Sequence, residues 1–154
     1  MISVTNDGLP DDLLPLQPLW ETLRPATPTR SESITRLYDD GRLYTWSDTR
    51  RRMVNGRLQR EAAPYAWRLD AQIRPEGVDQ VRELIRAGFM QLDERNAARK
   101  GFDQGIVVRR SNVDGVEHSV TFPASATSAL PQVIRDIDYA INANIESGAV
   151  PLDQ

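Results

Sequence analysis

The stretch Tyr65–Gly88, YAWRLDAQIRPEGVDQVRELIRAG, decides the fold class that the sequence predicts. Within it, Tyr65–Ile73 alternates larger apolar side chains with polar or small ones, a period of two typical of a β-strand with one buried face. Pro75 then begins a helix, since proline is tolerated at the first helical position, and Gly88 ends it. Four aliphatic side chains form one stripe along this helix: Val78, Val81, Leu84 and Ile85. The stretch therefore predicts a strand followed at once by an amphipathic helix.

A tight hairpin is expected upstream of this unit. Two partly apolar segments, Ile34–Tyr38 and Arg42–Trp46, flank Asp39-Asp40-Gly41, and an Asp-Gly pair is typical of a short β-turn. With Asp40-Gly41 at the tip, the predicted register places Leu37 opposite Tyr44. Because side chains alternate along a strand, each face is then partly apolar, with Ile34, Tyr38 and Leu43 on one and Leu37, Tyr44 and Trp46 on the other.

A second hairpin and a second helix are expected in the C-terminal half. Ile106–Phe122 contains Asp114-Gly115 as its turn, and pairing about that turn places His118 opposite Ser111. Most of the valines and Phe122 then share one face, which indicates a sheet with one buried side. Pro131 begins the helix, in which isoleucines recur at helical spacing: Ile134, Ile137, Ile141 and Ile145.

These segments predict a two-layer α+β sandwich in the order ββ-β-α-ββ-α. A mostly antiparallel sheet of about five strands carries two helices on one face. We expect residues 33–150 to form a single domain, preceded by a Pro-rich N-terminal arm at 1–32. Five prolines interrupt the arm, yet its leucines and Trp20 are too apolar for a free tail. The arm therefore packs either on its own domain or on a partner or second subunit.

The composition excludes several classes of site. The chain has 154 residues, 40% of them hydrophobic, with no cysteine and one histidine. Disulfides, thiol nucleophiles and sites that need two histidines are therefore excluded, and no glycine-rich nucleotide-binding string occurs, so we expect no metal and no cofactor. The start resembles no signal peptide, and no apolar run approaches the ~20 residues of a spanning helix. We expect a cytoplasmic protein of bacterial type with no membrane partner.

Basic side chains are concentrated in the middle of the chain. The net charge is −3, but residues 41–70 carry seven basic and three acidic side chains. Within them Arg50–Arg60, RRRMVNGRLQR, holds five arginines and the turn pair Asn55-Gly56, which together indicate an exposed edge ribbon. The ribbon is either a solvated edge or a contact for an acidic protein. A third alternative is single-stranded nucleic acid, because aromatic side chains that could stack on bases lie nearby in the sequence: Trp46, Tyr65 and Trp67.

His118 is the candidate for acid–base chemistry. Its predicted place on the face of Val116, Val120 and Phe122 also suits a hydrogen-bonded histidine at the edge of a core. Acidic pairs such as Asp39-Asp40 lack the spacing of a calcium loop, so they are better explained as turn and surface residues.

One further pattern extends over residues 34–145. A helix ends in L-I-x-x-x-F-x-x-L, a loop with Asp follows, and a second hairpin leads to a last helix after proline. The matching residues are Leu84-Ile85 to Phe89 and Leu92, Asp103, Asp114-Gly115 to His118, and Leu130-Pro131. This layout resembles small bacterial domains of unknown function, including the emfourin-type inhibitors of thermolysin-like metalloproteases. The family's glycine pair followed by Phe is replaced here by Asp39-Asp40-Gly41, so the resemblance implies the fold and assigns no inhibitory residue.

The residues thus favour a non-enzymatic module for protein–protein binding, with self-association or inhibitor-like binding as versions of it. The expected contact residues are apolar or basic: Leu16, Trp20, Tyr44, Trp46, Arg50, Arg51, Arg52, Arg57 and Arg60. The alternative is a nucleic-acid-binding accessory protein that uses the ribbon at 50–60. A third hypothesis is a small-molecule-binding protein or an enzyme with a site around His118.

Overall fold

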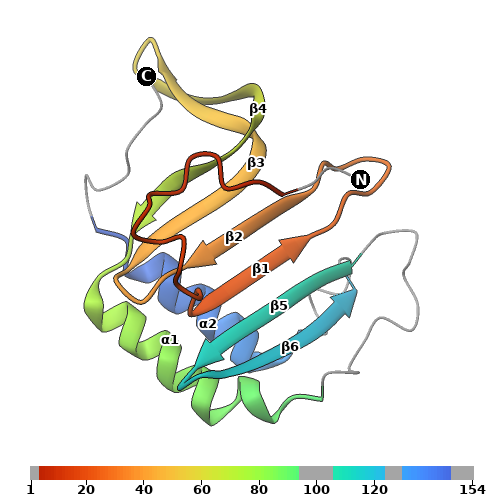
Figure 1. Cartoon of the computed structure of the whole chain (residues 1–154), viewed down its shortest axis with the longest axis vertical. Coiled ribbons are helices and arrows are strands. Elements are labelled where there is room, and N and C mark those ends of the chain that lie inside the picture. Colours follow the sequence, from red (N-terminus) through yellow and green to blue (C-terminus); the bar gives the residue numbers. More distant parts are fainter. Residues whose placement is uncertain (1–3, 94–105, 124–129, 147–154) are drawn as a thin grey trace.

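A computed structural model of the chain describes residues 4–93, 106–123 and 130–146. It shows an antiparallel sheet of six strands with two helices on one face, so the predicted α+β class is confirmed (Figure 1). The elements in chain order are β1 (Trp20–Arg24), β2 (Ser33–Leu37), β3 (Arg42–Val54), β4 (Arg57–Gln72), α1 (Pro75–Ala87), the 3-10 turn η1 (Phe89–Gln91), β5 (Ile106–Val113), β6 (Val116–Pro123) and α2 (Gln132–Ala143).

The sheet has the strand order β4-β3-β2-β1-β5-β6. The predicted count of about five strands is close, and the strand that it lacks is β1, which pairs with both β2 and β5. The Pro-rich arm at 1–32 is therefore not confirmed, because part of it forms an inner strand. Pro18 and Pro25 flank this strand without interrupting it. The sequence of β1 does not show the apolar alternation of a strand because it contains Glu21. The carboxylate of Glu21 is buried between Arg36 Nε (2.5 Å) and Arg110 Nη1 (2.8 Å).

The main core lies between the sheet and the two helices. Both helices begin where proline predicts, α1 at Pro75 and α2 directly after Pro131, and the aliphatic stripe of each faces the sheet. The predicted end of the second helix at Gly148 and Pro151 lies outside the described residues. The fully buried members of this core include Leu37, Ile73, Val81, Ile85, Phe89, Val120, Ile134 and Ile137.

The second hairpin is correctly predicted and the first is shifted by one residue. Ser111 pairs with His118 about the Asp114-Gly115 turn, as expected. In the first hairpin Leu37 pairs with Leu43, not with Tyr44, because the loop has three residues, Asp39 to Gly41, with Gly41 at φ +91°, and the Tyr38 N–H donates to the Arg42 carbonyl at 3.0 Å. Consequently Tyr44 and Trp46 share a face with Ile34 and Tyr38, opposite to the helices.

A bulge at Asp70 divides the strand Tyr65–Gln72 between the two faces of the sheet. Tyr44 pairs with Leu69 and Leu43 with Ala71, so Asp70 is an extra residue on β4. Trp67 and Leu69 therefore pack on the face away from the helices, and Ala71 packs on the helix side. The single-faced alternation predicted for this strand is wrong beyond the bulge.

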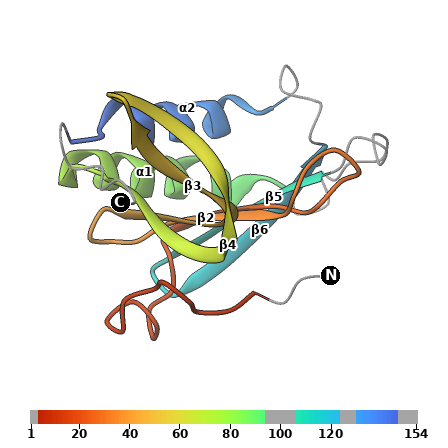
Figure 2. The same ribbon diagram turned by 90° about the horizontal axis from the view of Figure 1, so that it is seen from above.

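The N-terminal segment, residues 4–18, covers the face of the sheet away from the helices (Figure 2). Its Leu9 and Leu13 are buried in a second apolar cluster with Ile34, Tyr38, Tyr44, Trp46 and Trp67. The Trp67 backbone N–H donates to the Asp7 carbonyl at 2.7 Å, and its Nε1–H donates to the Thr5 carbonyl at 2.9 Å. Of the two alternatives for this segment, packing on its own domain is the one observed.

Candidate binding surface on the β3–β4 ribbon

The β3–β4 hairpin extends well beyond the sheet as a two-stranded ribbon (Figure 1). The β2–β3 pairing ends at Ile34 and Trp46, whereas β3 and β4 remain paired as far as Val54 and Arg57. Asn55 and Gly56 at its tip have φ of 52° and 77°, and two left-handed residues in a row are what a tight two-residue hairpin turn requires. The ribbon predicted at Arg50–Arg60 is therefore present.

A bend turns the ribbon toward the helix side of the sheet. Ser47 pairs with Ala66 but Thr49 pairs with Ala62, so β4 carries extra residues around Pro64. An irregularity of this kind bends a strand and increases its twist, and proline is tolerated there because it has no N–H to donate. Figure 2 shows the ribbon curving to the level of the helices.

The two faces of the ribbon carry different side chains, because cross-strand partners lie on the same face. On one face Arg50 is paired with Glu61, and Arg52 lies two residues along. Arg50 Nε is 2.6 Å from Glu61 Oε1 and Arg52 Nη1 is 3.6 Å from Glu61 Oε2. The hydrogen bond from Arg50 lowers the pKa of Glu61. Arg57, which is paired with Val54, lies on this face too. The face therefore holds three arginines and one carboxylate that neutralises them in part.

The opposite face combines arginine with exposed apolar side chains. Arg51 is paired with Arg60, and next to them Met53 is paired with Leu58. Met53 is 44% exposed and Leu58 is 52% exposed. Residues 48–61 contain five arginines and two acidic residues. This face, which we call the ribbon face (Arg51, Met53, Leu58 and Arg60), has no carboxylate of its own within the ribbon.

Toward the sheet the ribbon face continues into a shallow polar recess. Arg51 Nη2 is 3.4 Å from Asp70 Oδ1 and donates to the Asp70 carbonyl at 2.8 Å. Arg60 donates to Thr49 Oγ1 at 3.2 Å. Neither Arg57 nor Arg60 has an ion pair within the described part of the chain. The inner end of the ribbon is thus tied to the sheet, and the outer end carries the uncompensated charge.

Three of the residues predicted to contact a partner are buried within the chain, and this corrects the prediction. Trp20 lies in β1 under the helices, with its ring 4.7 Å from that of Phe89. Tyr44 and Trp46 lie under the N-terminal segment. Self-association through these three rings is not supported. The remaining predicted residues are at least partly exposed, namely Leu16, Arg50, Arg51, Arg52, Arg57 and Arg60.

The aromatic side chains near the ribbon are engaged elsewhere. Trp46 stacks on Tyr65 at 4.2 Å between ring centroids, and the Arg36 guanidinium lies 4.4 Å from the Trp67 ring centroid. Residues 48–63 contain no aromatic residue at all. Stacking on the bases of a single strand needs accessible rings, so the ribbon offers charge without the stacking component.

His118 sits at the edge of the main core. Its Nε2 is 2.8 Å from the Leu92 carbonyl oxygen, and its ring lies edge-on to Phe89 at 5.3 Å. Within residues 4–93, 106–123 and 130–146 no group of three or more acidic or histidine side chains could hold a metal ion. Over the same ranges no helix has the length and apolar character needed to cross a bilayer.

Met53 and Leu58 are the ribbon residues that sequence reasoning missed. The signal was present, because a two-residue Asn55-Gly56 turn fixes the register and so places these two side chains opposite each other.

Comparison with known proteins finds no matching family model, no similar curated protein and no similar solved structure. The resemblance to emfourin-type inhibitors therefore stays a prediction.

Proposed function

We propose that the protein is a non-enzymatic, cytoplasmic binding module whose β3–β4 ribbon docks on an acidic surface of a protein partner. The observation that supports this proposal is the ribbon face. There Met53 and Leu58 are exposed next to arginines whose charges are not all paired with carboxylates. Arginine and methionine are enriched at protein interfaces, and an exposed apolar pair on a projecting element is unusual for a merely solvated edge.

The same features favour a protein over a nucleic acid as the partner. The exposed apolar side chains, Met53 and Leu58, gain little binding free energy from contact with phosphates. The aromatic rings nearest the ribbon are buried or stacked, so they are not available to the bases. An acidic protein surface can instead pair with the arginine guanidiniums while its own apolar groups cover Met53 and Leu58. Nucleic acid is retained as an outcome of the test.

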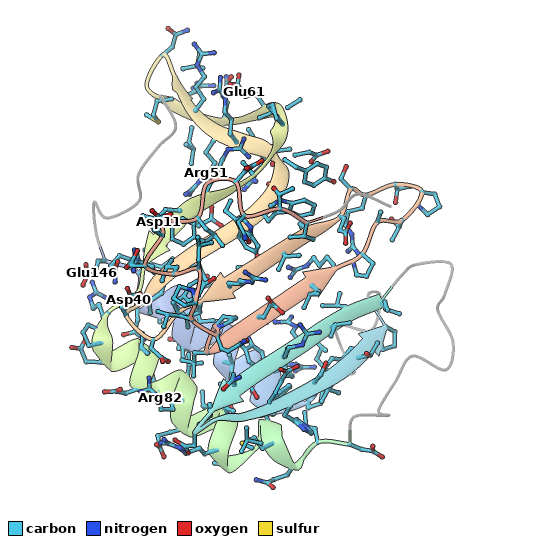
Figure 3. The ribbon with its side chains drawn as sticks, viewed as in Figure 1. Asp11, Asp40, Arg51, Glu61, Arg82 and Glu146 are labelled. Atoms are coloured by element: carbon cyan, nitrogen blue, oxygen red, sulfur yellow. The ribbon has the colours of Figure 1, made fainter. Side chains whose placement is uncertain are left out.

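Affinity capture from a lysate of the source organism, with and without nuclease treatment, tests this proposal with matched baits. The ribbon bait carries Arg57→Gln and Arg60→Gln, and the control bait carries Arg82→Gln and Arg86→Gln on α1, an equal change in net charge. Figure 3 places Arg82 on α1, at the other end of the molecule from the ribbon. A third bait, Met53→Ser with Leu58→Ser, tests the contribution of the exposed apolar pair on the ribbon face.

We expect one protein to be retained by the wild type and the control bait and to be lost from both ribbon baits. At about 0.2–1 kcal/mol for each exposed charge, the double arginine variant weakens Kd by roughly two- to thirtyfold. Equal retention by all four baits contradicts the proposal. Capture that disappears on nuclease treatment favours the nucleic-acid alternative.

A further inference from the structure

A second recess lies at some distance from the ribbon face, between α2 and the sheet. It is a groove of about 290 Å³. Its polar lining comes from four elements: Thr22 and Arg24 on β1, Thr35 on β2, Arg109 on β5, and Asp138 and Asn142 on α2. Apolar side chains, Trp20 and Leu37 among them, line the rest.

Cross-strand pairing brings the polar lining into a row. Thr22 pairs with Arg109 on one side and with Thr35 on the other, and Thr35 pairs in turn with Thr45. The hydroxyls of Thr35 and Thr45 are 3.2 Å apart, and Thr45 also hydrogen-bonds to Asp70. The side of a sheet that faces its helices normally carries apolar side chains, which pack under the helices. Here the threonine hydroxyls form a hydrogen-bonding surface instead.

Arg109 is the buried charge of the groove. Its side chain is 8% exposed and binds Asp138 through Nη1 at 2.9 Å and Nη2 at 3.3 Å, while Nη1 also donates to Thr22 Oγ1 at 3.3 Å. Its Nε is buried and has no hydrogen-bond partner within the described residues, and the same holds for Trp20 Nε1. Buried donors left without acceptors are costly, so the packing around Arg109 and Trp20 is not fully satisfied in hydrogen bonds.

Arg24 carries the charge that is not neutralised. It lines the groove beside Arg109, and its guanidinium has no hydrogen bond or ion pair to any residue in the described ranges. Burial lowers the pKa of Arg24, the positive charges of Arg109 and Arg30 lower it further, and the negative charge of Asp138 offsets part of this. Asp138 is the acidic residue of the lining, and it is already bound to Arg109. A half-buried guanidinium among other cations is stabilised by an anion.

We propose that this groove binds a small molecule with an anionic head group, carboxylate or phosphate, attached to an apolar body. The head group lies on Arg24 and accepts hydrogen bonds from the hydroxyls of Thr22 and Thr35. The apolar body lies on Leu43 and Ile141, the apolar lining residues that keep the most exposed surface. The volume of the groove is many times the ~10–15 Å³ that one water needs, so it has room for a small organic molecule. This binding does not depend on the ribbon, so either proposal can fail alone.

Calorimetric titration of the full chain tests the groove with three probes: inorganic phosphate, phenyl phosphate and hexanoate, each against sodium chloride at matched ionic strength. We expect phenyl phosphate or hexanoate to bind more tightly than inorganic phosphate, because each adds an apolar body. The stronger of the two identifies the head group. If no probe binds beyond the chloride control, the proposal is overturned.

Substitution of Arg24 locates the site. Arg24→Met removes the charge and keeps a long apolar stem, and we expect at least about tenfold weaker binding of the stronger probe, since a charge-assisted hydrogen bond contributes 1.5–3 kcal/mol. Arg57→Gln on the ribbon is the matched control and leaves Kd unchanged. The unliganded Arg24→Met variant should melt no earlier than the wild type. Unchanged binding by Arg24→Met overturns the proposal.

Substitution of Asp138 gives a test in the opposite direction. Asp138→Asn releases the Arg109 guanidinium from its carboxylate, so the same probe should bind more tightly than to the wild type. Weaker binding to this variant, in a protein that remains folded by circular dichroism, contradicts an anion site beside Arg109.

Discussion

Leu13 anchors the N-terminal segment on the sheet, and its replacement by alanine tests whether this segment is an integral part of the fold. Leu13 is 1% exposed and packs in the second apolar cluster, which also contains Trp46 and Trp67. Truncation of a buried leucine removes its transfer free energy and leaves a cavity, at a cost of about 3 kcal/mol within a range of about 2–5 kcal/mol. That is a large part of the roughly 5–15 kcal/mol by which a domain is stable.

The adjacent residue provides the control. Leu14 is 44% exposed, so Leu14→Ala should change the free energy of unfolding by no more than about 0.5 kcal/mol. Urea unfolding followed by circular dichroism measures both variants, and tryptophan emission reports on Trp46 and Trp67 in this cluster together with Trp20 in the main core. We expect a lower midpoint for Leu13→Ala with little change in slope. Equal midpoints for the two variants would refute the packing described for residues 4–18.

Two further predictions concern backbone geometry and pH. A Cβ on Gly8 would lie 2.1 Å from the Trp67 carbonyl oxygen at φ +95°, whereas one on Gly56 would meet nothing within 4 Å at φ +77°. Thermal melting should therefore show a larger loss for Gly8→Ala than for Gly56→Ala, whose cost is the strain of about 1–2 kcal/mol alone; the reverse order contradicts the segment's placement. The hydrogen bond from Arg86 lowers the pKa of Asp114 below 3.8, so its stabilisation is present above that value and lost as the pH falls through the lowered pKa. Melting of the wild type and Asp114→Asn between about pH 7 and pH 2 should converge at the acid end, and a constant difference would contradict this ion pair.

The parts of the fold that the sequence predicts well are those set by local chemistry. Pro75 begins α1, and the two-residue turns Asn55-Gly56 and Asp114-Gly115 give their hairpins the observed registers. The first hairpin is shifted because its loop contains three residues, Asp39 to Gly41, and a three-residue loop can also contain an Asp-Gly pair. Local patterns therefore fail where two turn lengths share one sequence signal.

The parts that could not be predicted depend on contacts between distant residues. β1 lacks an apolar alternation because Glu21 is buried with Arg36 and Arg110, which come from two other strands. Trp46 reads as a surface anchor until the N-terminal segment is placed over it. For the candidate site, the position of the arginines on an exposed ribbon follows from the sequence, whereas the burial of the neighbouring rings does not.

Site-specific photocrosslinking in living cells tests the central claim, that the ribbon is the contact with a protein partner, most directly. A benzophenone amino acid replaces Met53 on the ribbon face in one variant. In the control it replaces Tyr139, which is 74% exposed on α2. We predict a discrete protein adduct from position 53 that is absent from position 139 and is lost when Arg57 and Arg60 are changed to glutamine. A protein adduct from position 139 with none from position 53 would contradict the claim.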